Sequence, residues 1–262
     1  MLIKNEKHDL DNKYQSIKFH ALELRRRIMF CLIAFLISFL ILYPFSSYIF
    51  NFLVDPLYNI LKNQDSKRLI YTGLSEAFLV HIKVSLFSSI VFSLPYILYQ
   101  IWIFIAPGLY QKERRNFLLL FAFSPILFLF GILFTYFIIM PLAWSFFLSF
   151  ETSFIGKETL PIQLEARIGE YFSLSLQLML AFGLSFQLPV LLLLLSKLGL
   201  VTAKGLSKNR RYAVIIILIA AAFLTPPDVV SQIVLAIPLY GLYEMSIILI
   251  NNIKIERYHD RS

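Results

Sequence analysis

Residues 28–50 read IMFCLIAFLISFLILYPFSSYIF and contain no charged side chain. An α-helix rises about 1.5 Å per residue, so a run of this length can cross the roughly 30 Å hydrocarbon core of a bilayer. Arg25, Arg26 and Arg27 stand immediately before it, at the end of a polar leader. A run this long after a charged leader is typical of a retained anchor and not of a cleavable signal. The stretch therefore predicts a membrane protein.

The composition of the whole chain supports this prediction. Hydrophobic residues make up 58% of the 262 residues, whereas soluble domains contain about 45–50%. The formal net charge is +8, but the basic residues lie in short clusters between apolar runs, as they do in membrane proteins. We therefore expect no nucleic-acid partner. Cys31 is the single cysteine, which excludes a disulfide within the chain.

Further apolar runs follow the first. They occupy residues 84–106, 117 to about 141, 171–196, 212–227, and the stretch from 229 to the basic tail. The fifth run is short, because a helix of 16 residues is only about 24 Å long. Four of the runs contain a proline in their interior, at positions 95, 125, 189 and 238. Because proline lacks an N–H group, these runs are expected to form kinked and packed helices.

Two connecting segments have their own character. Residues 51–77 mix apolar and polar side chains around Pro56 and Gly73, and are expected to hold short interfacial helices. Trp144 and the aromatic residues after it are expected at the membrane interface, following a third helix that ends near Pro141. Together with the apolar runs, this pattern predicts an all-α protein with six transmembrane helices.

The distribution of positive charge predicts the orientation. With six spans, 18 of the 24 Lys and Arg residues lie on the side of the two termini and five lie on the other side. Cytoplasmic loops are the ones enriched in Lys and Arg, so both termini are expected in the cytoplasm. The chain then divides into a cytoplasmic leader (1–27), a six-helix transmembrane domain (28–250) and a cytoplasmic tail (251–262).

Motifs for catalysis, metal binding and nucleotide binding are missing from the sequence. There is no His-Glu-x-x-His and no Gly-x4-Gly-Lys-Ser/Thr, and none of the four histidines lies deep in an apolar run. Residues 183–186, GLSF, faintly resemble an intramembrane serine-protease motif, but no later span supplies a histidine as the base. We therefore expect neither an enzyme nor a cofactor.

A small-solute or ion transporter is the alternative from a different class. Such proteins place ionisable groups near mid-membrane, and Glu244 is the clear candidate here, with Gln177, Gln187 and Gln232 as weaker ones. A charged side chain at a helix centre costs about 2.5–3.5 kcal/mol on insertion scales. Glu244 is therefore either a protonated or snorkelling carboxyl group or a partner in a helix–helix contact, and both interpretations stay open.

Two carboxylates lie on the predicted cytoplasmic face. Glu23 stands four residues before Arg27, where an ion pair along a helix contributes about 0.2–0.5 kcal/mol, and Glu113 is flanked by Lys112, Arg114 and Arg115. Self-pairing needs no ligand and is favoured on these residues alone. Two carboxylates on one face would nevertheless suit a cationic ligand, and arginine is the best candidate because its guanidinium makes bidentate contacts.

Three motifs carry a resemblance to a known family. They are His20-x-x-Glu-Leu-Arg25, the stretch FIAPGLYQKERR at 104–115, and LTPPDVVSQ at 224–232 with AIPLY at 236–240. In this order they resemble TatC, the multi-span component of the twin-arginine protein translocase. The resemblance covers about residues 20–250 and agrees with the six-span topology.

The resemblance implies a receptor for signal peptides that carry paired arginines. Glu23 and Glu113 would engage the arginine pair, with Arg25 and Phe104 supporting the site. The implied partners are TatA- and TatB-type single-span proteins, and the receptor would self-associate in a larger complex in the lipid bilayer. The implied fold is a curved, cup-like bundle, and the implied energy source is the proton-motive force. The expected location is a bacterial inner membrane or its organelle equivalent.

The resemblance also implies an edge that docks partner helices. The residues expected there are Gln187, Thr225, Asp228, Gln232 and Glu244. Many family members carry a glutamate where this chain has Gln187. An amide can hydrogen-bond across helices in a membrane, at about 0.6 kcal/mol on average, but it cannot titrate. A role that needs a protonatable group at this position is therefore in doubt.

Overall fold

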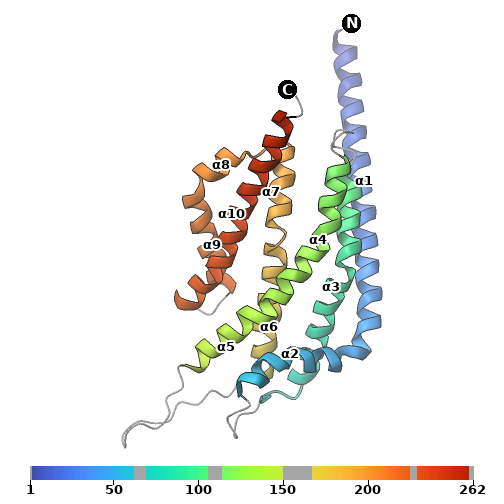
Figure 1. Cartoon of the computed structure of the whole chain (residues 1–262). Helices are drawn as coiled ribbons and strands as arrows, with labels where there is room; N and C mark the ends of the chain where they lie inside the picture. The colour runs from blue at the N-terminus through green and yellow to red at the C-terminus, as the bar shows by residue number, and fades with distance from the viewer. Residues whose placement is uncertain (1, 62–68, 106–113, 150–166, 225–228, 260–262) are drawn as a thin grey trace, which may run out of the picture.

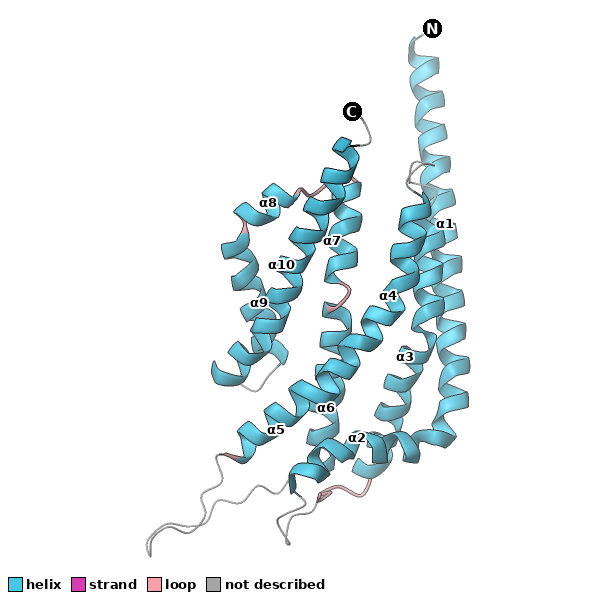
Figure 2. Cartoon of the chain, viewed as in Figure 1, coloured by secondary structure: helices cyan, strands magenta, loops and turns pink. Residues whose placement is uncertain are grey.

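Long helices dominate the computed structural model, which describes residues 2–61, 69–105, 114–149, 167–224 and 229–259 (Figure 1). Within these ranges the chain forms helices and no strand, apart from one isolated bridge between Ile70 and Arg167 (Figure 2). The predicted all-α class is therefore confirmed.

Four helical stretches of the described residues are long and apolar enough to cross a membrane. They are Ala21–Ile60, Glu76–Phe104, Phe123–Leu148 and Ile168–Lys197. The six-span count and the cytoplasmic location of the termini stay predictions. The beginning of α1 (Leu2–Leu42) and the end of α10 (Val229–His259) do lie at the same end of the molecule (Figure 1).

The first apolar run does not form one uninterrupted helix. Residues 28–50 were expected to span as a unit, but α1 ends at Leu42 and is followed by the short helix η1 (Tyr43–Phe45). Pro44 lies in the first turn of η1, where its missing N–H group breaks the hydrogen-bond ladder of α1. The chain then turns into α2 (Ser46–Leu61), which runs across the end of the bundle (Figure 1). This is the short helix expected near residues 51–77.

Pro56 within α2 explains one of the two tyrosine hydrogen bonds that α2 accepts. A helical carbonyl accepts from the residue four places on, so Pro56 leaves the Phe52 carbonyl without its donor. The Tyr136 hydroxyl donates to that carbonyl at 2.8 Å. The Tyr171 hydroxyl donates to the neighbouring Leu53 carbonyl at 2.6 Å. Because an unsatisfied backbone group is costly in lipid, these bonds fix α2 against the helices that carry the two tyrosines.

The third helical stretch is longer than predicted. It comprises α4 (Arg114–Phe134), a π-helical segment η3 (Thr135–Ile139) and α5 (Met140–Leu148), whereas the sequence placed its end near Pro141. The Met140 N–H group donates to the Thr135 carbonyl, which is the π-helical pattern, and Pro141 falls in the first turn of α5. A proline is tolerated in a first turn, so the helix continues. Trp144 is buried and packs on Tyr171, with ring centroids 5.0 Å apart.

The fourth stretch is broken where a proline predicted a kink. α6 (Ile168–Ser185) and α7 (Leu188–Lys197) are separated at Phe186 and Gln187, with Pro189 in the first turn of α7. α4 crosses α6 closely at this level. A Cβ atom on Gly131 would lie 2.8 Å from the Phe182 carbonyl oxygen, so this crossing requires glycine.

The chain ends in a hairpin of two helices. After α8 (Ala203–Lys208), α9 spans Arg210–Leu224 and is only 15 residues long, before α10. The shortness of the fifth run is therefore confirmed for its described part, and residues 225–227 lie outside the described residues.

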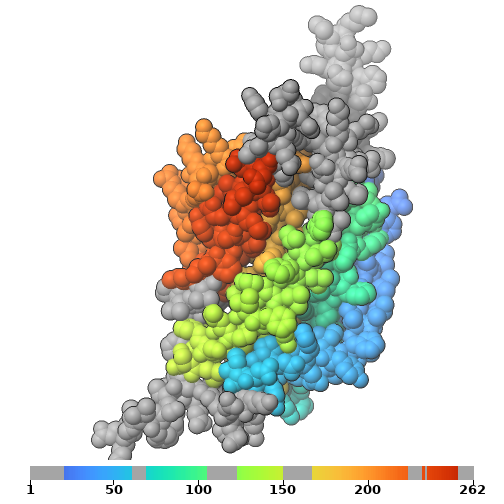
Figure 3. Space-filling model, in the orientation of Figure 1, coloured from blue at the N-terminus to red at the C-terminus, as the bar shows by residue number. Residues whose placement is uncertain are grey.

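Two hydrophobic clusters hold the bundle together. One joins α2 and α3 (Glu76–Ile105) to α5 and α6, and includes the fully buried Val84, Met140 and Phe172. The other joins α6 and α7 to α8, α9 and α10, and includes Phe182, Ala221 and Ile250. Figure 3 shows α4 and α5 crossing this face of the molecule between the two groups of helices. α1 packs mainly against α3.

Candidate functional site

Three of the four predicted arginine-binding residues lie on α1 and α3, which pack together. Glu23 and Arg25 are on α1, and Phe104 lies half-buried at the end of α3. Glu113 lies outside the described residues, so its position relative to Glu23 remains a prediction. Arg25 is exposed. The Arg26 guanidinium lies over the Phe30 ring, 5.5 Å from its centroid.

Glu23 is paired with Arg27, as their spacing predicted. The Arg27 Nε atom donates to Glu23 Oε1 at 3.1 Å, and Arg27 Nη2 contacts the same oxygen. The Glu23 side chain is 28% exposed and that of Arg27 is 17% exposed. The carboxylate therefore already holds a guanidinium, and it remains reachable from outside.

Arg27 of this ion pair also hydrogen-bonds to α3, through residues that were not identified as candidates from the sequence. Arg27 Nη1 donates to Gln100 Oε1 at 3.3 Å, and Gln100 Nε2 donates to the Tyr96 hydroxyl at 2.8 Å. Gln100 is buried. The signal in the sequence that could have pointed to them is the i,i+4 spacing of Tyr96 and Gln100 within an apolar run. Their link to Arg27 could not be predicted, because it depends on how α1 packs on α3.

Gln187, a residue of the predicted docking edge, hydrogen-bonds to another residue of the same chain. Its Nε2 atom donates to the Ser124 carbonyl at 2.9 Å, and its Oε1 atom accepts the Ser124 hydroxyl. Ser124 is buried on α4 beside Pro125. Gln187 therefore links α4 to the break between α6 and α7.

Two other glutamines brace the short helix α9. Gln232 Nε2 donates to the Leu218 carbonyl at 2.8 Å, and Gln177 Nε2 donates to the Phe223 carbonyl at 3.2 Å. The residue four places after Phe223 is Pro227, which has no N–H group to offer. Gln177 therefore supplies a donor that the helix itself cannot.

An apolar groove of about 300 Å³ lies along α9 beside Gln232. Its lining residues are Ile215, Leu218, Ile219, Ala222, Phe223 and Gln232. Of the other predicted docking residues, Thr225 and Asp228 lie outside the described residues. Of the predicted docking residues that the structure describes, Gln232 lines this groove, whereas Gln187 and Glu244 are not among its lining residues.

Glu244 is in an ion pair across the hairpin. Arg210 Nε lies 2.7 Å from Glu244 Oε1, and Arg210 Nη2 donates to Oε2 at 2.8 Å. The Tyr240 hydroxyl also donates to Oε1, at 2.7 Å. This geometry favours the interpretation of Glu244 as a helix–helix contact, here between α10 and the start of α9. The bidentate contact to arginine also favours a charged carboxylate over a protonated one.

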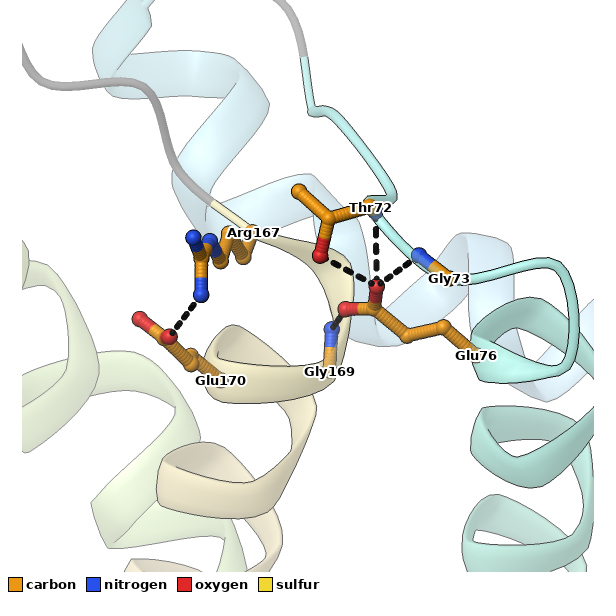
Figure 4. A network of polar contacts seen from close by, with 6 residues as sticks. All are labelled: Thr72, Gly73, Glu76, Arg167, Gly169 and Glu170. Atoms are coloured by element: carbon orange, nitrogen blue, oxygen red, sulfur yellow. Dashed lines mark hydrogen bonds and ion pairs between the residues drawn. The ribbon is translucent and has the colours of Figure 1, made fainter.

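Another polar cluster lies at the other end of α3. Glu76 Oε2 accepts the backbone N–H groups of Thr72 (2.8 Å) and Gly73 (3.3 Å), and Oε1 accepts that of Gly169 at 2.8 Å (Figure 4). A Cβ atom on Gly169 would lie 2.6 Å from Glu76 Oε1, so only glycine permits this approach. No motif in the sequence indicated this contact, which joins the segment before α3 to the first turn of α6.

Comparisons with known proteins all match this chain to one family. The model of the family described as "Sec-independent protein translocase protein (TatC)" matches residues 19–238. The TatC protein of Rickettsia prowazekii is 45% identical over 245 residues, covering 94% of this chain and 96% of that protein. The TatC protein of Escherichia coli is 37% identical over 230 residues, covering 87% and 85%.

Solved structures give the same result. A crystal structure of the twin-arginine translocase receptor TatC in the detergent DDM superimposes with a TM-score of 0.77 at 39% identity. The match covers 88% of this chain and 99% of the crystallised one. The similarity therefore extends over nearly the whole fold and is not confined to the short motifs.

Proposed function

This chain belongs to the TatC family of Sec-independent protein translocase proteins, and from that premise we propose that it is the receptor subunit of a twin-arginine translocase. It binds signal peptides that carry paired arginines and takes part in exporting folded proteins across the membrane. The observation that carries the proposal is the Glu23 carboxylate at the α1–α3 contact, which holds an arginine side chain within the chain itself.

The proposed signal-peptide site comprises Glu23, Arg25, Phe104 and Glu113. Glu23 accepts a guanidinium through charge-assisted hydrogen bonds, which are shorter and stronger than neutral ones. Phe104 supplies apolar contact at the end of α3, and Glu113 supplies the second carboxylate for the second arginine. Arg25 limits the negative charge of the empty site.

The proposed docking edge for TatA- and TatB-type helices follows α9. The apolar groove beside Gln232 supports this assignment, because a membrane helix packs by shape against a neighbour. Thr225 and Asp228 are proposed for its end, and Glu244 for keeping α9 and α10 together. The Gln187 amide hydrogen-bonds to Ser124. Gln187 therefore contributes to the docking edge by holding the break between α6 and α7 in its shape.

The proposed setting is a bacterial inner membrane, with six spans and both termini in the cytoplasm. The proton-motive force would supply the energy, since a charge crossing 100 mV gains about 2.3 kcal/mol. A solute transporter is less well supported. Glu244 is paired with Arg210, and the three glutamines hydrogen-bond to backbone carbonyls within the chain. These contacts brace helices and do not form a shared polar cavity.

Export of a folded reporter with an Arg-Arg signal tests the proposal. The chain, produced with TatA and TatB proteins from its own genome, replaces the host's TatC. The wild-type chain should export the reporter, and the Glu23→Ala, Glu113→Ala double variant should not. Glu170→Ala is the matched control, because Glu170 is an exposed carboxylate on α6 that forms an ion pair with the exposed Arg167. Full export by the double variant would contradict the site assignment.

Cross-linking tests the docking edge separately. A photoreactive residue at Ile219 in the groove should capture a TatA- or TatB-type helix, whereas one at Leu36, on the exposed face of α1, should not. Equal capture at both positions would remove the support for a docking edge on α9.

A further inference from the structure

We propose that Arg27 occupies the arginine-binding position of the empty receptor, and that Gln100 is the second acceptor of that position for an arginine of the signal peptide. The inference rests on the proposed function and adds two residues to its site. Arg27 acts as a built-in competitor, and an incoming arginine takes over the acceptors that Arg27 holds.

The acceptors around Arg27 are arranged for a guanidinium group. Its Nε and Nη2 atoms face Glu23 Oε1, with the Nε contact at 3.1 Å, and its Nη1 atom donates to Gln100 Oε1 at 3.3 Å. All three nitrogens of the planar group therefore have an acceptor, supplied by two different helices. A guanidinium presents its donors as a rigid fork, whereas an ammonium group is a compact point charge. The position should therefore prefer arginine over lysine.

The orientation of Gln100 is fixed by its neighbours. Arginine can only donate hydrogen bonds, so the amide oxygen of Gln100 must face Arg27. The amide Nε2 atom donates to the Tyr96 hydroxyl at 2.8 Å. Gln100 is only 8% exposed, so this acceptor lies at the inner side of the position. The more exposed Glu23 lies at its outer side.

The position of Arg27 in the sequence makes it a permanent competitor. It lies one helical turn after Glu23, so its side chain reaches the carboxylate without any movement of the backbone. The ion pair is partly buried but still reaches solvent. Solvent screening weakens such a pair, so a better-placed arginine can displace it. Arg27 would then neutralise Glu23 in the empty receptor and leave when the signal peptide binds.

The test measures peptide affinity with the full chain in membrane vesicles. The probes are a fluorescent peptide with two adjacent arginines and its Lys-Lys counterpart. Arg27→Gln should lower the Kd of the Arg-Arg peptide by about two- to fivefold, the range expected for an ion pair that solvent still reaches. Arg26→Gln is the matched control. It removes the same charge one residue away, from a side chain that lies over Phe30, and should leave the Kd unchanged.

A second variant tests Gln100. In the Arg27→Gln background, Gln100→Leu should raise the Kd of the Arg-Arg peptide by about tenfold or more, as expected for loss of a buried hydrogen bond to a charged group. It should change the Kd of the Lys-Lys peptide less. Equal effects on the two peptides would overturn the assignment of Gln100.

The controls separate this inference from the proposed function. If Glu23→Gln binds the Arg-Arg peptide as tightly as the wild type, the proposed site itself is wrong. If Glu23→Gln loses binding but Arg27→Gln does not tighten it beyond Arg26→Gln, only the competitor role is overturned. If Arg27→Gln fails to fold, Arg27→Lys provides the test instead. It keeps the positive charge but lacks the planar, forked set of donors of a guanidinium group, so it should also lower the Kd of the Arg-Arg peptide. A Kd for Arg27→Lys equal to or above that of the wild type would overturn the inference.

Discussion

Gln187 and Ser124 hydrogen-bond to each other twice across the bundle, through the Gln187 amide and both the carbonyl and the hydroxyl of Ser124. The pair joins α4 to the break between α6 and α7. It lies where two prolines, Pro125 and Pro189, weaken the backbone ladders of these helices. The amide thus holds two interrupted helices in register without carrying a charge.

The first prediction concerns this pair. Gln187→Leu removes both hydrogen bonds and should destabilise the protein by about 1.2 kcal/mol, twice the average for one interhelical hydrogen bond in a membrane. Ser124→Ala keeps the backbone carbonyl and removes only the hydroxyl bond, so it should cost about 0.6 kcal/mol. The double variant should cost less than the sum because the two residues share that bond. Unfolding in mixed micelles measures all three. Strictly additive costs would show that the two residues do not interact.

The second prediction concerns the proline-freed carbonyl of α2. Tyr136→Phe removes the hydroxyl that donates to the Phe52 carbonyl and should cost about 1 kcal/mol. Pro56→Ala restores the missing N–H group, so the same tyrosine substitution should cost less in that background. Tyr171→Phe is the control. Its acceptor, Leu53, lies four residues before Leu57 and not before a proline. An unchanged cost of Tyr136→Phe in the Pro56→Ala background would contradict this explanation.

The third prediction concerns the crossing of α4 and α6. Gly131→Ala places a Cβ atom 2.8 Å from the Phe182 carbonyl oxygen, and overpacking of this kind costs about 1–3 kcal/mol. Gly241→Ala is the matched control, because its Cβ would have no atom within 4 Å. Thermal unfolding of the two variants in detergent checks the difference. Equal midpoints would show that the crossing tolerates a wider separation.

The fourth prediction concerns the Glu76 contacts in Figure 4. Glu76→Ala removes the acceptor of three backbone N–H groups, those of Thr72, Gly73 and Gly169. Hydrogen exchange at Gly169 should accelerate, because an amide exchanges faster once it loses its acceptor. Glu170→Ala, which removes an exposed carboxylate in the same region, should leave that amide unchanged. Slow exchange at Gly169 in the Glu76→Ala variant would mean that another group protects it.

The sequence predicted those features that depend on local spacing. The uncharged runs located the long helices, and the i,i+4 spacing of Glu23 and Arg27 predicted their ion pair. Pro189 marked the break before α7 because a proline removes a donor wherever it stands. Three motifs in matching order and spacing were sufficient to predict the family.

Other features depend on contacts between distant segments and could not be predicted. The helix continues through Pro141 because a π-helical turn shifts the hydrogen-bond pattern just before it. Gln100 meets Arg27 only after α1 packs on α3. Glu76 meets Gly169 although 93 residues separate them. Such pairings are decided by packing, which hydropathy and residue spacing do not encode.

The two hydrophobic clusters have a consequence for biogenesis. The buried residues of the first cluster all lie between residues 53 and 179, whereas those of the second extend to residue 250. Because translation proceeds from the N-terminus and chains begin to fold during synthesis, the first cluster can assemble as soon as α6 has entered the membrane. The helices made last, α9 and α10, then add onto a surface that is already formed. Newly made protein would thus acquire the half containing Glu23 before the half containing the α9 groove.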